Sequence, residues 1–363
     1  MKMSKTISCD NNHALNNFMK NYSEMMPEIK KIILRSSGTY ETTIYEFICL
    51  TALIVYKGNW KEITNDILLN TNLTKLVINN CSIKTINKNI DMLEQLQIFA
   101  LNNNDIFVIP HCVYNMVNLY SLSLDENNIQ MLSLKINNLT NLTYLSLRNN
   151  KLTDLTKSLW THPSLKYLDV SCNKIKNINL PKNLTVTSPL IVLKMSSNKL
   201  TNLPDCFGNL TALEHLELDN NEFTDIGLEF IQKLTNLSVL SLTCNLITNF
   251  TQLTSSHIGL SSLSLSNNPL ENLDEKILDL PSIKCINLKY IPSFCRIEEK
   301  YLIRCANRGV ELKIIDTRNV KLSKDIDKLD NYDEDKDQKH VIKLWYTSNN
   351  IISSQKLNKF SKK

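Results

Sequence analysis

The chain has 363 residues, of which 42% are hydrophobic and 21% are charged, and this balance excludes wholesale disorder. The net charge of +5 is scattered, whereas nucleic-acid-binding proteins concentrate lysine and arginine on one stripe. Glycine occurs only six times, which disfavours nucleotide-binding folds because their phosphate loops need clustered glycines. We therefore expect no nucleic-acid partner.

The cellular compartment is predicted from the first residues and from the cysteines. The opening segment, MKMSKTISCDNNHALNN, lacks the apolar run of about seven or more residues that a secretory signal needs. The longest apolar stretch, residues 47–56, is too short to cross a bilayer. Ten cysteines without a C-x-x-C spacing fit reduced thiols. These features predict a cytoplasmic protein in which the nine N-x-S/T triplets stay unmodified.

The N-terminal region is predicted to consist of a tail and a helical cap. Residues 1–12 are polar and are expected to be disordered. Residues 13–49 are expected to form a helical N-terminal cap, with two short helices broken at Pro27 between about Ala14 and Arg35. A partner-recruiting helix is the alternative interpretation of this segment.

The middle of the chain is an internal repeat. The segment LTYLSLRNNKL places Leu142, Leu145, Leu147, Asn150 and Leu152 in the pattern L-x-x-L-x-L-x-x-N-x-L. The pattern returns at steps of about 23 residues, with small slips. The nine clear units begin at Leu73, Leu96, Leu119, Leu142, Leu165, Leu190, Leu213, Leu237 and Leu260.

Degenerate units starting at Leu50 and Ile283 flank the nine clear ones, so the array spans residues 50–291. Within each unit the x-L-x-L-x core alternates with period two, which predicts a short strand with one buried face. The asparagine is expected to satisfy backbone groups where the chain leaves the strand. Apolar offsets of three and four in the return segments predict a helical turn or short helix per unit.

This pattern resembles the leucine-rich repeat family over roughly residues 50–291. Pro110 and Pro204 stand in an L-x-x-L-P arrangement that looks like the 23-residue class of intracellular signalling scaffolds. The resemblance implies an α/β solenoid. It would be a curved horseshoe with a parallel β-sheet on the concave face, short helices or turns on the convex face, and a helical N-terminal cap.

Residues 292–322 are expected to form a C-terminal cap, with a helix over residues 294–308 ending at Gly309 and a strand over residues 310–315. Family members that are secreted often close the last repeat with disulfides in a C-x-C cluster. No C-x-C occurs here, which favours free thiols. Residues 323–363 read as a charged linker and tail. The acidic stretch DNYDEDKD lacks the glycine and the closing glutamate of a calcium loop. The last residues fit a docking peptide or an ordered tail.

Recognition is expected to use the outward positions between the inward leucines, which form three columns on the concave face. At both ends of the array these columns carry mostly serine, asparagine and alanine. The middle is rich in tyrosine and charge, and tyrosine and arginine are enriched in binding hot spots. The predicted partner-binding residues are Asp125, Tyr144, Arg148, Tyr167, Asp169, Lys194, His215, Glu217 and Asp219.

Three interpretations of this patch remain open from the sequence. It binds a protein or peptide partner, or it is a solvated face whose charges neutralise one another across strands, or the flanks carry the binding instead. At about 4.8 Å per strand the patch spans roughly 20 Å, which suits a protein surface or a peptide.

Catalysis is not expected. His215 with Glu217 and Asp219 is the one acid–base cluster, and an open concave sheet offers no water-excluding pocket. Cys172 and Cys244 have no histidine placed beside them by the repeat, and the six histidines show no metal-ligand spacing. We expect a monomeric, non-catalytic scaffold without cofactor or metal.

Two further function classes remain as alternatives. The Asn-, Ile- and Lys-rich composition resembles that of repeat proteins from insect-infecting large DNA viruses (entomopoxvirus-like), which suggests an effector that engages host signalling or ubiquitin-ligase proteins. A secreted recognition or adhesion domain is the other alternative.

Overall fold

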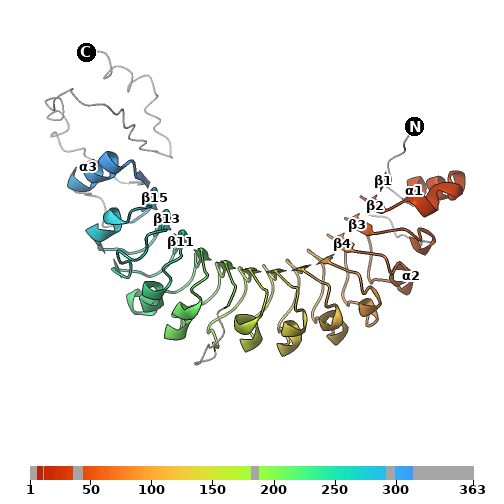
Figure 1. The fold of residues 1–363 in the computed structure, drawn as a ribbon, viewed down its shortest axis with the longest axis horizontal. Helices are drawn as coiled ribbons and strands as arrows, with labels where there is room; N and C mark the ends of the chain where they lie inside the picture. Colours follow the sequence, from red (N-terminus) through yellow and green to blue (C-terminus); the bar gives the residue numbers. More distant parts are fainter. Residues whose placement is uncertain (1–5, 11, 36–43, 181–187, 292–298, 314–363) are drawn as a thin grey trace, which may run out of the picture.

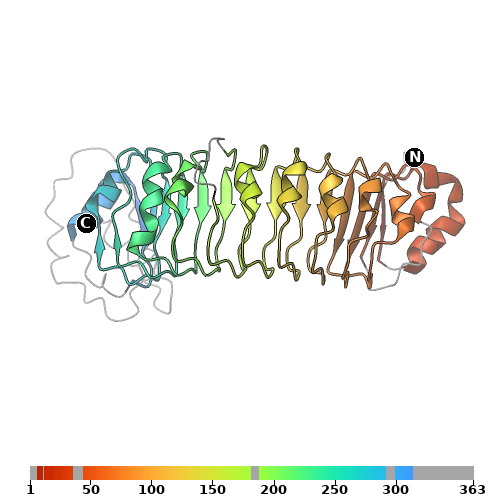
Figure 2. The same ribbon diagram turned by 90° about the horizontal axis from the view of Figure 1, so that it is seen from below.

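The computed structural model describes residues 6–10, 12–35, 44–180, 188–291 and 299–313. In these residues the chain winds into a horseshoe, with a parallel sheet along the inner curve and helical turns along the outer curve (Figure 1). Viewed from below, the helical turns lie in a row across the convex side (Figure 2). The expected curved solenoid is therefore confirmed.

The main sheet has 14 strands within the described part of the chain, and neighbours in sequence are neighbours in the sheet. Its strands are β1 (Thr6–Cys9), β2 (Lys31–Leu34), β3 (Ala52–Tyr56), β4 (Lys75–Asn79), β5 (Ile98–Ala100), β6 (Ser121–Ser123), β7 (Tyr144–Ser146), β8 (Tyr167–Asp169), β9 (Val192–Lys194), β10 (His215–Glu217), β11 (Val239–Ser241), β13 (Ser262–Ser264), β15 (Cys285–Asn287) and β16 (Glu311–Lys313).

The return segments are mostly short 3₁₀ helices, which matches the expected turn or short helix per unit. They are η1 (Ser23–Glu28), η2 (Ile44–Glu46), η3 (Ile90–Met92), η4 (His111–Asn115), η5 (Leu134–Asn138), η6 (Lys157–Thr161), η7 (Asp205–Asn209), η8 (Asp225–Lys233) and η9 (Glu275–Asp279). The α-helices are α1 (Asn12–Asn21), α2 (Asn65–Leu68) and α3 (Glu299–Arg308), and β12 (Asn249–Phe250) pairs with β14 (Asn272–Leu273) in a small second sheet.

The core is a continuous aliphatic spine between the two faces. Leu145 of β7 pairs in register with Leu168 of β8, and Leu168 pairs with Leu193 of β9. All three side chains are fully buried. Because each inward leucine packs against the same position of the next unit, no single unit can bury its own apolar face, and the units stabilise one another.

The asparagines form a second ladder along one side of this spine. The Asn150 amide donates to the carbonyl of Leu147 in its own unit at 3.1 Å and to that of Leu124 in the preceding unit at 2.9 Å. Its side-chain oxygen accepts the N–H of Ile129 at 3.0 Å. The predicted role of the asparagine is confirmed, since it satisfies buried backbone groups between neighbouring units.

The residue before each asparagine turns the chain out of the strand with a left-handed backbone. Asn149 has a φ of 53°, and the same position is left-handed in every described unit from Lys57 to Tyr290. Asparagine tolerates this conformation better than other side chains with a Cβ, and it stands at several of these positions.

The N-terminal expectations are partly wrong. Residues 1–12 were expected to be disordered, yet Thr6–Cys9 is strand β1 of the main sheet. Helix α1 lies in the expected cap, but Pro27 falls within η1, and the second expected helix is replaced by strand β2. Ile7 and Ile32 alternate inward like the repeat leucines, so two further units extend the array at this end.

At the other end, α3 and β16 lie where the apolar spacing predicted a helix and a strand. Strand β16 pairs with β15 and continues the sheet. The residues of the charged linker and tail, 323–363, lie outside the described residues. Among the helices that the structure describes, none has the length and apolarity to span a membrane.

Candidate functional site

The predicted patch lies on strands β6–β10 and on the turns that follow them, near the middle of the inner curve (Figure 1). The strand alternation sends Leu145, Leu168 and Leu193 inward and leaves the residues on either side of each leucine on the concave face. The curved sheet therefore brings side chains from five consecutive units onto one surface.

Two tyrosines form the centre of the patch. Tyr144 and Tyr167 are register partners on β7 and β8, and their rings stack with centroids 4.5 Å apart and planes 10° apart. Both side chains remain partly exposed. A stacked pair of aromatic rings has few rotamers to lose on binding, so it offers a rigid contact surface at low entropic cost.

The second of the three columns carries the charged side chains of Asp169, Lys194 and Glu217, and their charges are only partly neutralised. Lys194 and Glu217 form an ion pair of 2.8 Å between β9 and β10, and both side chains are 30% exposed. Asp169 is the register partner of Lys194 on the other side, yet it does not pair with it. Asp169 instead accepts the backbone N–H of Ser171 at 2.9 Å. The alternating charges therefore form one ion pair, and Asp169 forms none with any residue that the structure describes.

The third column carries Asp125 and Asp219, and each of these carboxylates accepts hydrogen bonds from residues of the next unit. Asp125 accepts the Ser146 hydroxyl at 2.5 Å and the backbone N–H of Arg148 at 2.8 Å. Asp219 repeats this arrangement with the hydroxyl of Ser241 and the N–H of Thr243. Both carboxylates fasten one unit to the next, which is a structural role that the spacing alone did not reveal.

The Arg148 side chain is exposed, and its guanidinium forms no ion pair with any residue that the structure describes. Asp125, which lies beside Arg148 in the same column, contacts it through the Arg148 backbone N–H. The guanidinium is left available to a partner.

The electrostatic character of the patch is negative. It holds four carboxylates and two cations, a formal charge of −2 when His215 is neutral. Burial raises the pKa of Asp125 and Asp219 above the ordinary aspartate value, and their hydrogen bonds offset this in part. Burial and the neighbouring carboxylates raise the pKa of the Tyr144 and Tyr167 phenols.

The three acid–base residues singled out from the sequence are His215, Glu217 and Asp219. His215 and Glu217 lie on the concave face of β10, two residues apart, and no hydrogen bond joins His215 to Glu217 or Asp219 in the described structure. Asp219 is engaged by Ser241 and Thr243. Over the described ranges, no group of three His, Cys, Asp or Glu side chains is placed to hold a metal ion.

Comparison with known protein families gives matches within the repeat array. A family model described as leucine rich repeat matches residues 117–175 and 163–223, and one described as leucine rich repeats (2 copies) matches residues 211–255. Residues 117–255 therefore carry leucine-rich repeats, and the described residues have the fold of a leucine-rich repeat solenoid. A search of curated proteins gave no match.

Solved structures resemble the repeat array in fold. An internalin from Listeria monocytogenes is 24% identical with a TM-score of 0.65, and the match covers 78% of this chain and 80% of that one. A leucine-rich repeat protein of Leptospira interrogans is 23% identical with a TM-score of 0.59, covering 85% and 87%. These values describe a shared architecture.

A receptor domain has the same architecture. The leucine-rich repeat ectodomain of the Arabidopsis thaliana membrane receptor kinase GASSHO1/SCHENGEN3 is 19% identical with a TM-score of 0.58. The match covers 79% of this chain and 39% of that one. That structure was solved in complex with CASPARIAN STRIP INTEGRITY FACTOR 2.

An apolar row on the concave face was not predicted from the sequence. Ile33, Ile54, Val77 and Ala100 are successive register partners in the second column of β2–β5 and pack together there. The row lies upstream of the nine residues predicted to bind a partner, in units whose repeat motif is weaker. The signal in the sequence is the alternation of inward residues in these units, Leu53 with Val55 and Leu76 with Ile78, which leaves Ile54 and Val77 outward.

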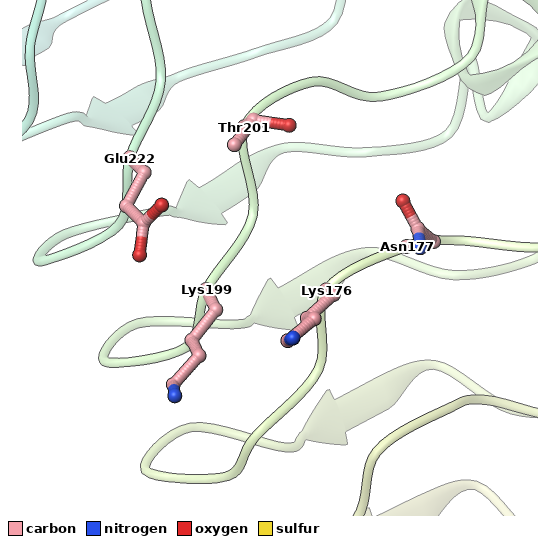
Figure 3. A pocket seen from close by; sticks show the side chains of 5 residues that line it. All are labelled: Lys176, Asn177, Lys199, Thr201 and Glu222. Atoms are coloured by element: carbon pink, nitrogen blue, oxygen red, sulfur yellow. The ribbon is translucent and has the colours of Figure 1, made fainter.

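A shallow depression of about 390 Å³, which was not predicted from the sequence, lies on the flank of the solenoid (Figure 3). Its lining side chains come from the loops that follow β8, β9 and β10, and all five are exposed. A ligand there would keep most of its contact with water, so this depression lacks the enclosure of a small-molecule site. The lining residues are Lys176, Asn177, Lys199, Thr201 and Glu222.

Proposed function

We propose that this leucine-rich repeat protein is a non-catalytic scaffold that binds a protein or peptide partner on its concave face. The binding residues are the nine of the predicted patch on β6–β10. The observation that carries the proposal is the stacked pair of Tyr144 and Tyr167, which is partly exposed at the centre of a charged surface. Rigid aromatic side chains surrounded by polar groups are typical of binding hot spots.

The architecture supports the same proposal. The plant leucine-rich repeat ectodomain of similar fold was solved in complex with CASPARIAN STRIP INTEGRITY FACTOR 2, which supports a binding role for this architecture. A continuous concave surface of several strands presents many side chains to one partner without any rearrangement of the core. We further propose that the protein acts as a monomer.

The experiment is affinity capture with the full chain, followed by identification of the bound proteins. The test variant is Tyr144→Ala/Arg148→Ala/Tyr167→Ala, which removes the exposed centre of the patch. The matched control is Met131→Ala/Leu134→Ala, because these exposed apolar side chains lie outside the concave columns.

We expect the control to capture the same partners as the wild type and the test variant to lose them. Partners that the test variant retains at wild-type level would refute the concave-face proposal. Unchanged circular dichroism of both variants excludes unfolding as the cause of a loss, since all five side chains are partly exposed.

We propose a cytoplasmic location as well. The proposal is supported by the nine cysteines that lie within the described residues, all of which are free thiols. The competing function is a secreted recognition domain, which the nine N-x-S/T triplets and the similarity to a receptor ectodomain favour. Thiol titration and intact mass separate the two, because a secreted form carries disulfides and glycans and a cytoplasmic form carries neither. The viral or parasite effector remains a prediction from composition alone.

A further inference from the structure

The concave face of strands β2–β5, on the N-terminal arm of the inner curve (Figure 1), differs in chemistry from the patch on β6–β10. From Ser123 to Glu217 the middle column carries only polar side chains. On β2–β5 the same column is the apolar row, whose members pack against one another: Ile33, Ile54, Val77 and Ala100. A contiguous apolar surface rimmed by polar side chains is typical of an interaction site.

The apolar surface continues on both sides of this row. Ala52 and Ile98 lie in the first column and are partly exposed, and Tyr56 lies in the third column and is 39% exposed. Ile54 and Val77, each 6% exposed, form the close-packed floor between these two columns. A partner therefore meets a continuous sheet surface, as in most protein interfaces, and needs no enclosed pocket.

The charged side chains beside the apolar row are all positive. Lys31 and Lys75 lie in the first column as the register partners of Ala52, one on either side. Both are partly exposed, and neither forms an ion pair with any residue that the structure describes. Arg35 directly follows β2 and is exposed. The outward positions of β2–β5 carry no carboxylate, whereas the patch on β6–β10 carries four.

We propose that the surface of β2–β5 binds a partner segment that carries aliphatic side chains next to carboxylates. The apolar row, with Ala52 and Ile98, receives the aliphatic side chains, and Lys31 and Lys75 pair with the carboxylates. Two strand spacings, about 9–10 Å, separate the lysines, so one short segment reaches both. The inference goes beyond the proposed function because it assigns a second surface, which lies outside the nine residues of the patch.

Charge complementarity selects this occupant over others. A basic segment would meet Lys31, Lys75 and Arg35 without a counter-charge. Nucleic acid would satisfy these cations, but single strands bind by stacking their bases on several aromatic rings. Tyr56 is the one aromatic side chain at the outward positions of β2–β5. An entirely acidic segment would leave the apolar row without contact.

The test uses the full chain and three immobilised libraries of short peptides. The first library is randomised among leucine, valine and aspartate, the second has lysine in place of aspartate, and the third has serine in place of leucine and valine. The charge variant is Lys31→Gln/Lys75→Gln. Its matched control is Lys84→Gln/Lys88→Gln, which removes two exposed lysines outside the strands.

The apolar variant is Val77→Thr, which keeps the shape of the side chain and adds a hydroxyl. Its matched control is Val239→Thr, which makes the same change on β11, outside both surfaces. Circular dichroism verifies that each variant folds.

We expect the wild type to retain the first library more strongly than the other two. Lys31→Gln/Lys75→Gln should weaken this retention about twofold to thirtyfold, the range for two partly exposed ion pairs, and raised salt should weaken it in the wild type. Val77→Thr should also weaken it, because the hydroxyl makes the apolar row polar. Both controls should bind like the wild type.

Equal retention of the aspartate and lysine libraries by the wild type, or retention of neither, would overturn the inference. An aspartate preference that survives Lys31→Gln/Lys75→Gln places the cations elsewhere and refutes it too. Retention of the serine library at the level of the first library means that the apolar row is not used. A dimer in gel filtration that Val77→Thr disrupts would assign the row to a second copy of the chain instead. The proposed function is judged separately by the capture experiment with Tyr144→Ala/Arg148→Ala/Tyr167→Ala.

Discussion

Removing one asparagine of the ladder tests how neighbouring units are joined. In Asn150→Ala, the backbone N–H of Ile129 loses its acceptor and remains buried. The carbonyls of Leu124 and Leu147 each lose one donor but keep another, from Asn127 at 3.0 Å and from Asn173 at 3.0 Å. The Arg148 carbonyl also loses the Asn150 amide, at 3.3 Å, and keeps the Glu126 N–H, at 2.8 Å. The substitution therefore strands one buried group completely and removes one donor from three carbonyls.

The magnitude follows from these contacts. An orphaned buried N–H costs about 1–3 kcal/mol, and each lost bond to a carbonyl that keeps another donor costs about 0.5–1.5 kcal/mol. Partial relaxation around the alanine lowers the sum, so we expect the free energy of unfolding to fall by about 2–4 kcal/mol. Urea unfolding followed by circular dichroism measures this loss, and hydrogen exchange at the Ile129 amide localises it.

The control for this experiment is Lys151→Ala, which changes the exposed neighbour of Asn150. Surface substitutions of this kind stay within about 0.5 kcal/mol of the wild type. If Asn150→Ala unfolds at the same free energy as Lys151→Ala, and the Ile129 amide exchanges at the wild-type rate, the asparagine ladder does not join the units as described.

Three other substitutions have defined outcomes. Burial lowers the pKa of His162 below its unfolded value, so stability is full above about pH 6.5 and falls as the pH drops through the folded pKa. His162→Leu should flatten this loss in urea unfolding between about pH 7 and pH 5. Leu168→Ala removes a fully buried side chain and should cost about 2–5 kcal/mol in the same assay. Asp169→Asn should lower the phenol pKa of Tyr167, which NMR of ring-labelled tyrosine detects, because the Asp169 charge contributes to raising it.

The middle of the fold was predictable because each unit repeats one local rule. Inward leucines at a fixed spacing determine the strand, its register and its neighbours, so Leu145 beside Leu168 followed from the sequence. The N-terminal units were missed because Ile7 and Ile32 are 25 residues apart and Ile32 and Leu53 are 21 apart. The second of these units has Ser37 at the asparagine position, and the first has Asn12 there but Cys9 in place of the second strand leucine, so neither matches the full motif.

The candidate site was predictable in its columns but not in its contacts. Register alone placed Tyr144 beside Tyr167 and Lys194 between Asp169 and Glu217. Whether Lys194 forms its ion pair with Asp169 or with Glu217 depends on side-chain rotamers and desolvation. The repeat spacing carries no information on either. The hydrogen bond of 2.5 Å from the Ser146 hydroxyl to Asp125 likewise depends on side-chain conformation and not on the repeat spacing.

Photo-crosslinking from a single position tests the concave-face proposal most directly. A photo-reactive phenylalanine analogue replaces Tyr144 on the inner curve or Leu134 on the outer side, and the full chain is irradiated in the cells that produce it. Binding through the concave patch predicts a discrete crosslinked protein from position 144 and none from position 134. The same crosslinked protein from position 134, with none from position 144, would contradict it.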